Sequence, residues 1–193
     1  MNDNIGAQLT FIIPSIDNLK YGFDIKDAKL TNKLETISEF TSSAIYELRD
    51  TIWAMNKTEV SIEDLQSRIS NFIDKADVAS DGVEFNFSSN TSEIGNLKFT
   101  SVEGMNIYRI IQESINNALK YSEAKHINVD FSAEEHTLVF KISDDGKGFD
   151  IQNIQMGNGI NNMNKRAHDI AADIDVSSAI NKGTQVVLKM GRS

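Results

Sequence analysis

The chain has 193 residues, of which 40% are hydrophobic, and its formal net charge is −9 at pH 7. This length fits one domain with an added element or two small domains, and the composition allows a buried core. The acidic balance argues against a nucleic-acid partner, and the absence of cysteine excludes disulfides and thiolate metal sites. We recognise no bilayer-spanning run and no signal peptide, so we expect a cytoplasmic fragment; an anchor of a membrane-bound parent would lie upstream.

Residues 1–57 have the spacing of paired helices. Apolar residues recur every three or four positions on both sides of the stretch YGFDIKD, which suits a turn. We expect a two-helix hairpin, N-terminally truncated, that forms a four-helix bundle in a homodimer, because two helices alone bury little surface. Packing of the hairpin on the rest of its own chain is the alternative. The recurring residues are Ile5, Leu9, Ile12, Ile16, Leu19 and Phe23, then Leu30, Leu34, Ile37, Thr41, Ala44, Leu48, Thr51 and Met55.

Residues 58–190 have the pattern of a second domain with mixed elements. Ser61 and Asp64 resemble a capping box at a helix start. The order of helices and strands predicts an α+β sandwich with one layer of sheet and one of helices. We interpret residues 191–193 as a cloning remnant. The spacing predicts helices at 57–76, 101–124 and 158–172, strands at 82–87, 126–133, 137–145, 173–179 and 183–190, and at 89–100 a loop with room for a short strand.

Glu113 and Asn117 are the first candidates for chemistry. They are four residues apart in the predicted helix 101–124 and therefore share one face of it. Carboxylate and amide oxygens are ligands that Mg²⁺ prefers, and a carboxylate can also act as a base. Taken alone, the pair is better explained as the solvated face of an amphipathic helix.

Two glycine-containing stretches provide further candidates. In SDDGKGF, Asp144 follows a strand and could accept a hydrogen bond from an exocyclic amine, while Gly146 and Gly148 allow a close approach of ligand to backbone. In GNGINNMNKR, Gly157 and Gly159 precede a helix whose N-terminus would favour a phosphate. A simple acidic turn and a flexible loop are the alternatives.

A last candidate is Thr184, which follows Gly183 at the start of the final strand. Its hydroxyl and the nearby N–H groups could hold a phosphate, although in isolation a hairpin turn is the better explanation of the dipeptide. The four blocks in this order are far more specific than any one of them. Together they resemble the ATP-binding domain of the GHKL superfamily, which includes gyrase, MutL, the ninety-kilodalton heat-shock chaperones and sensor histidine kinases.

This resemblance implies a Bergerat-type fold over roughly residues 60–190, with ATP and Mg²⁺ as ligands. It implies that Asn117 binds Mg²⁺, that Glu113 is a general base or polarising residue, and that Asp144 accepts the adenine amino group. It further implies that Lys120 and Tyr121 lie near the phosphates or ribose. Gly146, Gly148 and Thr184 would belong to the adenine pocket, and Gly157 and Gly159 would be the hinges of an ATP lid.

The residues of one block narrow the resemblance to a subfamily. GNGINNMNKRA is similar to the G-x-G-L-x-x-M-x-x-R-A signature of nitrate-sensor-like bacterial histidine kinases, with Met163 and Arg166 at the Met and Arg positions. That subfamily places a dimerisation hairpin before the ATP domain. Its implied reaction is autophosphorylation of a helix-one histidine from ATP, followed by transfer to an aspartate of a response regulator.

The phosphoacceptor position of that subfamily carries no histidine in this chain. Its His-Asp-x-x-Gly motif aligns with residues 2–6, so Asn2 stands where the histidine should be and Asp3 keeps the neighbouring acid. An amide nitrogen is not nucleophilic, so we expect a chain that binds Mg-ATP without phosphorylating itself. An engineered replacement and a natural pseudokinase both explain Asn2. Ala7 occupies the position of a glutamine linked to phosphatase activity, which argues against that activity.

Two other functions stay open at this stage. One is an ATP-gated interaction module, in which nucleotide changes only how the hairpin docks its partners. The other is a serine kinase of the anti-sigma-factor type, which shares the ATP fold, although the heptad hairpin argues against it.

Overall fold

The computed structural model describes residues 14–16, 18–19, 22–23, 27, 29–34, 36–38, 41, 45, 48, 59–80, 82–90, 97–134, 136–151 and 158–191. The chain divides into two compact units, Met1–Lys57 and Thr58–Ser193, and each is described by itself. Among the described residues, no helix has both the length and the apolar character that crossing a membrane requires.

In the first unit, nearly all of the described residues are helical. Asp27 caps the second helical stretch, because its carboxylate accepts hydrogen bonds from the backbone N–H groups of Lys29 (2.8 Å) and Leu30 (3.3 Å). Four apolar residues of the predicted repeat are exposed in the single chain, namely Leu19, Phe23, Leu30 and Ile37. The four-helix bundle of a dimer stays a prediction.

The second unit begins with a short strand, where the sequence predicts a helix. β1 (Glu59–Ser61) pairs antiparallel with β3 (Lys98–Thr100), and α3 (Ile62–Ala79) starts only after it. The predicted capping box is confirmed: the Ser61 hydroxyl accepts from the Asp64 N–H at 3.1 Å, and the Asp64 carboxylate accepts from the Ser61 N–H at 3.3 Å. This cap fixes the start of α3 directly after Ser61, so the predicted helix start at residue 57 was wrong.

Five strands form one mixed sheet in the order β2-β4-β5-β7-β6. β2 runs parallel to β4, whereas the pairs β4–β5, β5–β7 and β6–β7 are antiparallel. The β5–β7 ladder pairs Asp144 with Thr184, so these two residues lie side by side at one end of the sheet. The strands are β2 (Glu84–Asn90), β4 (His126–Glu134), β5 (Thr137–Asp144), β6 (Asp173–Ser178) and β7 (Thr184–Gly191).

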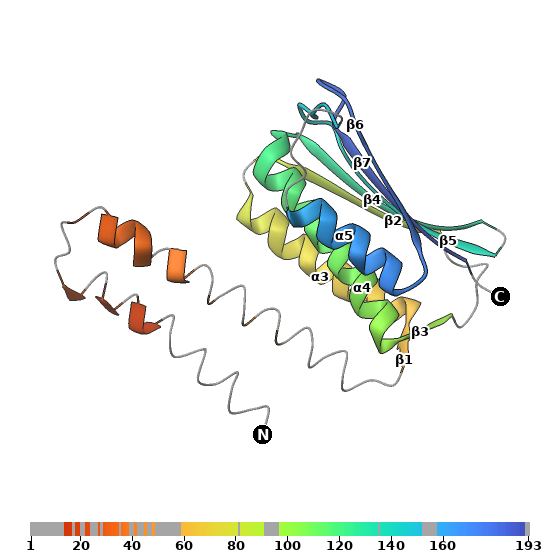
Figure 1. Ribbon diagram of the computed structural model, residues 1–193, viewed down its shortest axis with the longest axis horizontal. Coiled ribbons are helices and arrows are strands. Elements are labelled where there is room, and N and C mark those ends of the chain that lie inside the picture. Colours follow the sequence, from red (N-terminus) through yellow and green to blue (C-terminus); the bar gives the residue numbers. More distant parts are fainter. Residues whose placement is uncertain are drawn as a thin grey trace. The chain divides into compact units, whose positions relative to one another are not determined.

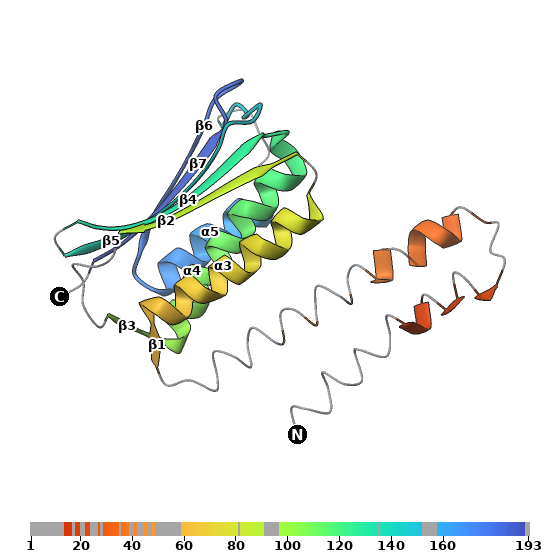
Figure 2. The same cartoon turned by 180° about the vertical axis from the view of Figure 1, so that it is seen from behind.

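Three helices cover one face of this sheet (Figure 1 and Figure 2). They are α3, α4 (Ser101–Asn117) and α5 (Asn158–Asp169). The core between the layers includes the edge-to-face contact of Phe131 with Phe140, whose ring centroids are 4.8 Å apart. The predicted α+β sandwich with one sheet layer and one helix layer is therefore confirmed. The predicted apolar face of α4 is also confirmed, since Ile107, Ile110, Ile111 and Ile115 are fully buried.

The C-terminal end of α4 leads directly into the functional region. Ala118–Ser122 continues the helix as a π-helical turn, and Glu123 ends it in the left-handed conformation with φ 57°. π-helical turns inside helices are frequent at functional sites. This turn brings the Ser122 carbonyl oxygen within 2.8 Å of the Lys147 N–H, so it contacts the loop that follows β5.

Candidate functional site

A pocket of about 430 Å³ opens between the helix layer and one end of the sheet. Its size lies within the range of small-molecule sites. Residues from α4, the π-helical turn, α5 and three strands contribute to it. The lining residues are Glu113, Ser114, Asn117, Ala118, Tyr121, Ser122, Ile142, Ser143, Asp144, Gly148, Phe149, Gly159, Ile160, Met163, Val176, Thr184 and Val186.

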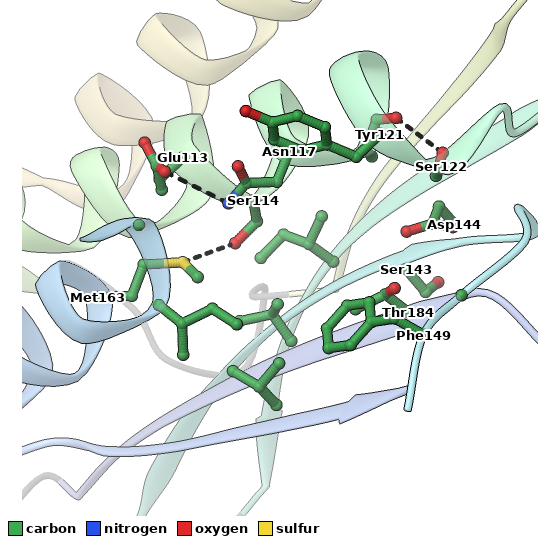
Figure 3. A pocket seen from close by; sticks show the side chains of 17 residues that line it. Glu113, Ser114, Asn117, Tyr121, Ser122, Ser143, Asp144, Phe149, Met163 and Thr184 are labelled. Carbon is green, nitrogen blue, oxygen red and sulfur yellow. Dashed lines mark hydrogen bonds between the residues drawn. The ribbon is translucent and has the colours of Figure 1, made fainter. Parts of the chain in front are cut away.

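The pocket has two polar ends with an apolar middle (Figure 3). Glu113 and Asn117 on α4 form one end, and Asp144 with Thr184, at the end of strands β5 and β7, forms the other. Aliphatic side chains lie between them. An elongated ligand with a flat apolar ring at one end and charged groups at the other matches this distribution.

Asp144 is held by hydrogen bonds from two sides. Its Oδ1 accepts the Gly146 N–H at 2.9 Å, and Thr184 donates to the carboxylate from both its backbone and its hydroxyl. Burial raises the pKa of Asp144 above its ordinary value, and these hydrogen bonds oppose the rise. A partly buried, oriented carboxylate that lines a pocket is well placed to accept a hydrogen bond from an amine of a ligand.

Gly146 and Gly148 shape the loop after β5 through contacts with the protein itself. A Cβ on Gly146 would overlap the Ser122 carbonyl oxygen, and one on Gly148, whose φ is +54°, would overlap that of Ala179. A Cβ on Gly183, whose φ is +72°, would likewise overlap the carbonyl oxygen of Asp144. These glycines therefore allow the loop to pack closely beside Asp144. Sequence reasoning attributed Gly146 and Gly148 to the approach of a ligand.

Glu113 and Asn117 contact each other as their spacing predicts. The Asn117 Nδ2 donates to Glu113 Oε1 at 3.3 Å. Gly159, in the first turn of α5, faces both, because a Cβ there would overlap Glu113 Oε1 and lie 3.3 Å from Asn117 Nδ2. The N-terminus of α5 thus adds its partial positive charge to this end of the pocket, which favours an anionic group there.

The structure separates the two neighbours predicted to be near the phosphates or ribose. Tyr121 lines the pocket although 65% of it is exposed, whereas Lys120 is exposed and is not among the lining residues. Both are in the π-helical turn, whose wider helical path a regular α-helical pattern does not represent. The predicted residues Asn2, Asp3 and Gly157 lie outside the described part of the chain.

Several functional positions were missed by sequence reasoning. The Ser114 hydroxyl lies 3.4 Å from Met163 Sδ and so connects α4 with α5 inside the pocket. Phe149 also lines the pocket, and its N–H donates to the Ser178 hydroxyl at 3.0 Å. The one available signal was their position directly beside the blocks singled out above. Across the described residues, no group of three or more His, Cys, Asp and Glu side chains forms a metal cluster.

Comparison with known proteins identifies the domain that carries this pocket. Residues 103–192 match the family described as histidine kinase-, DNA gyrase B-, and HSP90-like ATPase. This region is an ATP-binding domain of that family. The match includes α4, the Asp144 loop, α5 and both final strands, so the ATP-binding domain contains every described residue that sequence reasoning assigned to the site. Membership supports ATP as the ligand of the pocket.

A wider relationship extends over nearly the whole chain. The oxygen sensor histidine kinase NreB of Staphylococcus carnosus (strain TM300) is 26% identical over 192 residues, which are 98% of this chain and 54% of NreB. The chain thus spans about half the length of that relative. The family match and this similarity together support a bacterial sensor histidine kinase with a GHKL ATP-binding domain.

Solved structures show the same fold. The histidine kinase domain of the blue-light activated histidine kinase from Erythrobacter litoralis EL346 gives a TM-score of 0.63 at 15% identity, covering 97% of this chain and 94% of that chain. Full-length ShkA in complex with AMPPNP gives a TM-score of 0.61 at 13% identity, covering 100% of this chain and 45% of ShkA.

Proposed function

We propose that this chain is the catalytic core of a sensor histidine kinase that binds Mg-ATP in the pocket between α4 and the sheet. The observation that carries the proposal is the two-ended pocket within an ATP-binding domain. Its Asp144 end suits the adenine base, and its Glu113–Asn117 end suits the triphosphate with its cation.

At the adenine end, the Asp144 carboxylate accepts a hydrogen bond from the exocyclic amino group. The hydrogen bonds from Gly146 and Thr184 fix the direction in which the carboxylate points. The apolar middle of the pocket, with Ile142 and Val186, contacts the faces of the ring. An oriented acceptor within apolar walls gives selectivity for adenine, because guanine presents a carbonyl oxygen where adenine presents its amino group.

At the phosphate end, Asn117 holds Mg²⁺ and Glu113 acts beside it. The residues fit such an ion, since the two side-chain oxygens are on one helix face and the bound phosphates supply further ligands. When bound, the ion neutralises charge on the phosphates during phosphoryl transfer. Glu113 then orients or deprotonates the attacking group, and the N-terminus of α5 favours the phosphate charge.

Asn2 leaves this chain without a phosphoacceptor. In the parent reaction, an imidazole nitrogen forms a bond to the γ-phosphorus while the bond from that phosphorus to the β–γ bridging oxygen breaks and ADP leaves. The ring proton passes to a base such as Asp3, and the phosphoryl group then moves to a response-regulator aspartate. Because the amide of Asn2 is not nucleophilic, this chain binds nucleotide but does not label itself.

The homodimer forms through the helical hairpin of residues 1–57. Leu19, Phe23, Leu30 and Ile37 belong to the predicted heptad repeat and are exposed in the single chain. A second copy would bury them, as the subunits of a four-helix bundle do.

The binding experiment compares Asp144→Asn with Asp175→Asn. Asp175 is an exposed residue of β6, so the same chemical change is made outside the pocket. We expect Asp144→Asn to weaken ATP binding roughly tenfold or more, because the hydrogen bond loses its charged acceptor and the new NH₂ group cannot accept. Isothermal titration calorimetry measures both affinities. Equal ATP affinity of Asp144→Asn and the unmodified chain would disprove the adenine assignment.

The transfer experiment restores the histidine with Asn2→His. We expect acid-labile labelling from γ-³²P-ATP in this variant and none in the unmodified chain. Labelling that is absent although ATP binds favours an ATP-gated interaction module. Acid-stable phosphate on a serine of a partner favours the serine-kinase alternative instead.

A further inference from the structure

Asp145, the neighbour of the proposed adenine acceptor, joins the end of β5 to the start of β4. Its Oδ1 accepts the backbone N–H groups of Lys125 (2.8 Å) and His126 (2.9 Å), and its Oδ2 lies 2.7 Å from His126 Nδ1. The Asp145 N–H in turn donates to the His126 carbonyl oxygen at 3.3 Å. We call these four contacts the Asp145 clasp.

The imidazole of the clasp faces charged groups from three segments. His126 Nε2 lies 3.7 Å from Glu84 Oε2 on β2, Asp145 approaches from the end of β5, and Lys125 precedes it on its own segment. The hydrogen bond with Asp145 raises the pKa of His126 above 6.5, with a smaller contribution from Glu84, while desolvation and Lys125 oppose the rise. The same hydrogen bond lowers the pKa of Asp145 to about 2. Asp145 is thus ionised throughout the physiological range.

The clasp begins where the β4–β5 ladder ends. The last ladder pair is Ile127 with Asp144, and the clasp joins the next residue on each segment. Successive side chains of a strand point to opposite faces, and Asp144 lines the pocket whereas Asp145 does not. Asp145 therefore acts on a ligand indirectly, through the backbone that carries Asp144 and through its negative charge, which helps to raise the pKa of Asp144.

The clasp is one of several attachments of this loop, and two others are made by the backbone of Lys147. The Lys147 N–H donates to the Ser122 carbonyl oxygen at 2.8 Å, and the Asn181 N–H donates to the Lys147 carbonyl oxygen at 2.7 Å. Both act on the far side of Gly146 from Asp144. Among these attachments, the clasp is the one adjacent in sequence to Asp144, so it fixes the backbone that carries the carboxylate, while Gly146 and Thr184 hold the carboxylate itself.

We propose that Asp145, clasped by His126 and by two backbone N–H groups, is a positioning residue that holds Asp144 in the direction required for the nucleotide base. This inference rests on the proposed adenine contact of Asp144. The positive imidazole strengthens the clasp, so its protonation favours ATP binding. Because His126 loses its charge as pH rises through its raised pKa, ATP affinity falls on the alkaline side only.

The first experiment changes Asp145 and compares two ligands. We expect Asp145→Ala to weaken ATP binding roughly tenfold, and Asp145→Asn less, since the amide oxygen still accepts the backbone N–H groups. Binding of inorganic tripolyphosphate, which has no base, should not change. The matched control is Asp173→Ala, an exposed residue of β6. A merely structural defect would weaken both ligands together and would overturn the proposal.

The second experiment measures the pH profile of ATP binding with His126 variants. His126→Gln is neutral at every pH and His126→Lys is charged over the whole range, so titration of ATP itself cancels in the comparison. From about pH 6 to about pH 9, the unmodified chain should change from the affinity of His126→Lys to that of His126→Gln, a difference of roughly two- to fivefold. His136→Gln, at the other end of the β4–β5 hairpin, is the control and should match the unmodified chain.

The outcomes separate this inference from the proposed function. If Asp144→Asn weakens ATP binding but Asp145→Ala binds like Asp173→Ala, the positioning role is wrong and the adenine contact stands. A constant ratio between His126→Gln and the unmodified chain across pH likewise overturns the role of the imidazole. If Asp144→Asn also leaves ATP binding unchanged, the proposed function itself is wrong.

Discussion

The two ends of the pocket are built from different kinds of contact. At the Asp144 end, backbone groups and glycines without room for a Cβ fix the loop, and a Cβ on Gly183 would overlap the Asp144 carbonyl oxygen. At the Asn117 end, one side-chain hydrogen bond of 3.3 Å connects Glu113 with Asn117, and Gly159 faces a side chain. The first end is therefore preorganised, while the second can adjust to a ligand.

Gly183→Ala should produce the largest effect, because it places a Cβ against backbone at a positive φ. We expect a loss of roughly 2 kcal/mol or more in the free energy of unfolding, together with loss of ATP binding. Denaturant unfolding measures the first quantity. Gly82→Ala is the matched control: its φ is +81° but nothing lies within 4 Å of its Cβ position, so only about 1 kcal/mol should be lost. Equal losses in the two variants would contradict the close packing at Asp144.

Asn117→Ala should affect the cation and leave the fold intact. We expect Mg²⁺ to strengthen ATP binding in the unmodified chain and to have roughly tenfold less effect, or none, in the variant. Calorimetric titrations with Mg²⁺ and with EDTA give the ratio. Asn116→Ala, one residue earlier on α4 and outside the pocket lining, should retain the full Mg²⁺ effect. A normal Mg²⁺ effect in Asn117→Ala would exclude this residue as the ligand.

Gly159→Ala tests whether the Asn117 end can adjust. The atom that the new Cβ would overlap is the end of the Glu113 side chain, which can move, and alanine favours a helix over glycine by up to about 1 kcal/mol. We expect the free energy of unfolding to stay within about 1 kcal/mol of the original. Denaturant unfolding beside Gly183→Ala makes the comparison directly. A loss as large as that of Gly183→Ala would show that the two ends are equally rigid.

Asp144→Asn should have the smallest effect, a rise in thermal stability at pH 7. Burial raises the pKa of Asp144, so the ionised carboxylate destabilises the folded state above that pKa and the neutral amide removes this cost. The gain should not exceed about 1 kcal/mol, because solvent screens a partly exposed group. It should shrink as pH falls toward about 4. Melting curves at both pH values test this, and a lower Tm at pH 7 would contradict it.

Much of the second unit could be predicted from local patterns. The capping box of Ser61 with Asp64, the apolar face of α4 and the β4–β5 hairpin depend on neighbours in sequence, and all three are confirmed. The parallel pairing of β2 with β4 and the short β1–β3 sheet depend on contacts between distant segments. Periodicity carries no information about such contacts, which is why residues 59–61 were assigned to a helix.

The candidate site was predictable in the same uneven way. The contact of Glu113 with Asn117 follows from their spacing. The position of Asp144 in the pocket follows from its place at the end of a strand. The π-helical turn that contains Lys120 and Tyr121 has no signature in the residue pattern. The contacts that explain Gly146 and Gly148 come from Ser122 and Ala179, which are far from them in sequence, so only the fold reveals them.

A crystal structure of this chain with Mg²⁺ and AMPPNP tests the central claim most directly. We predict the adenine amino group within hydrogen-bond distance of the Asp144 carboxylate and the cation on the side-chain oxygen of Asn117. The Asp145 clasp should remain closed beside the base. Adenine at the Glu113 end, or nucleotide bound outside this pocket, would contradict the account.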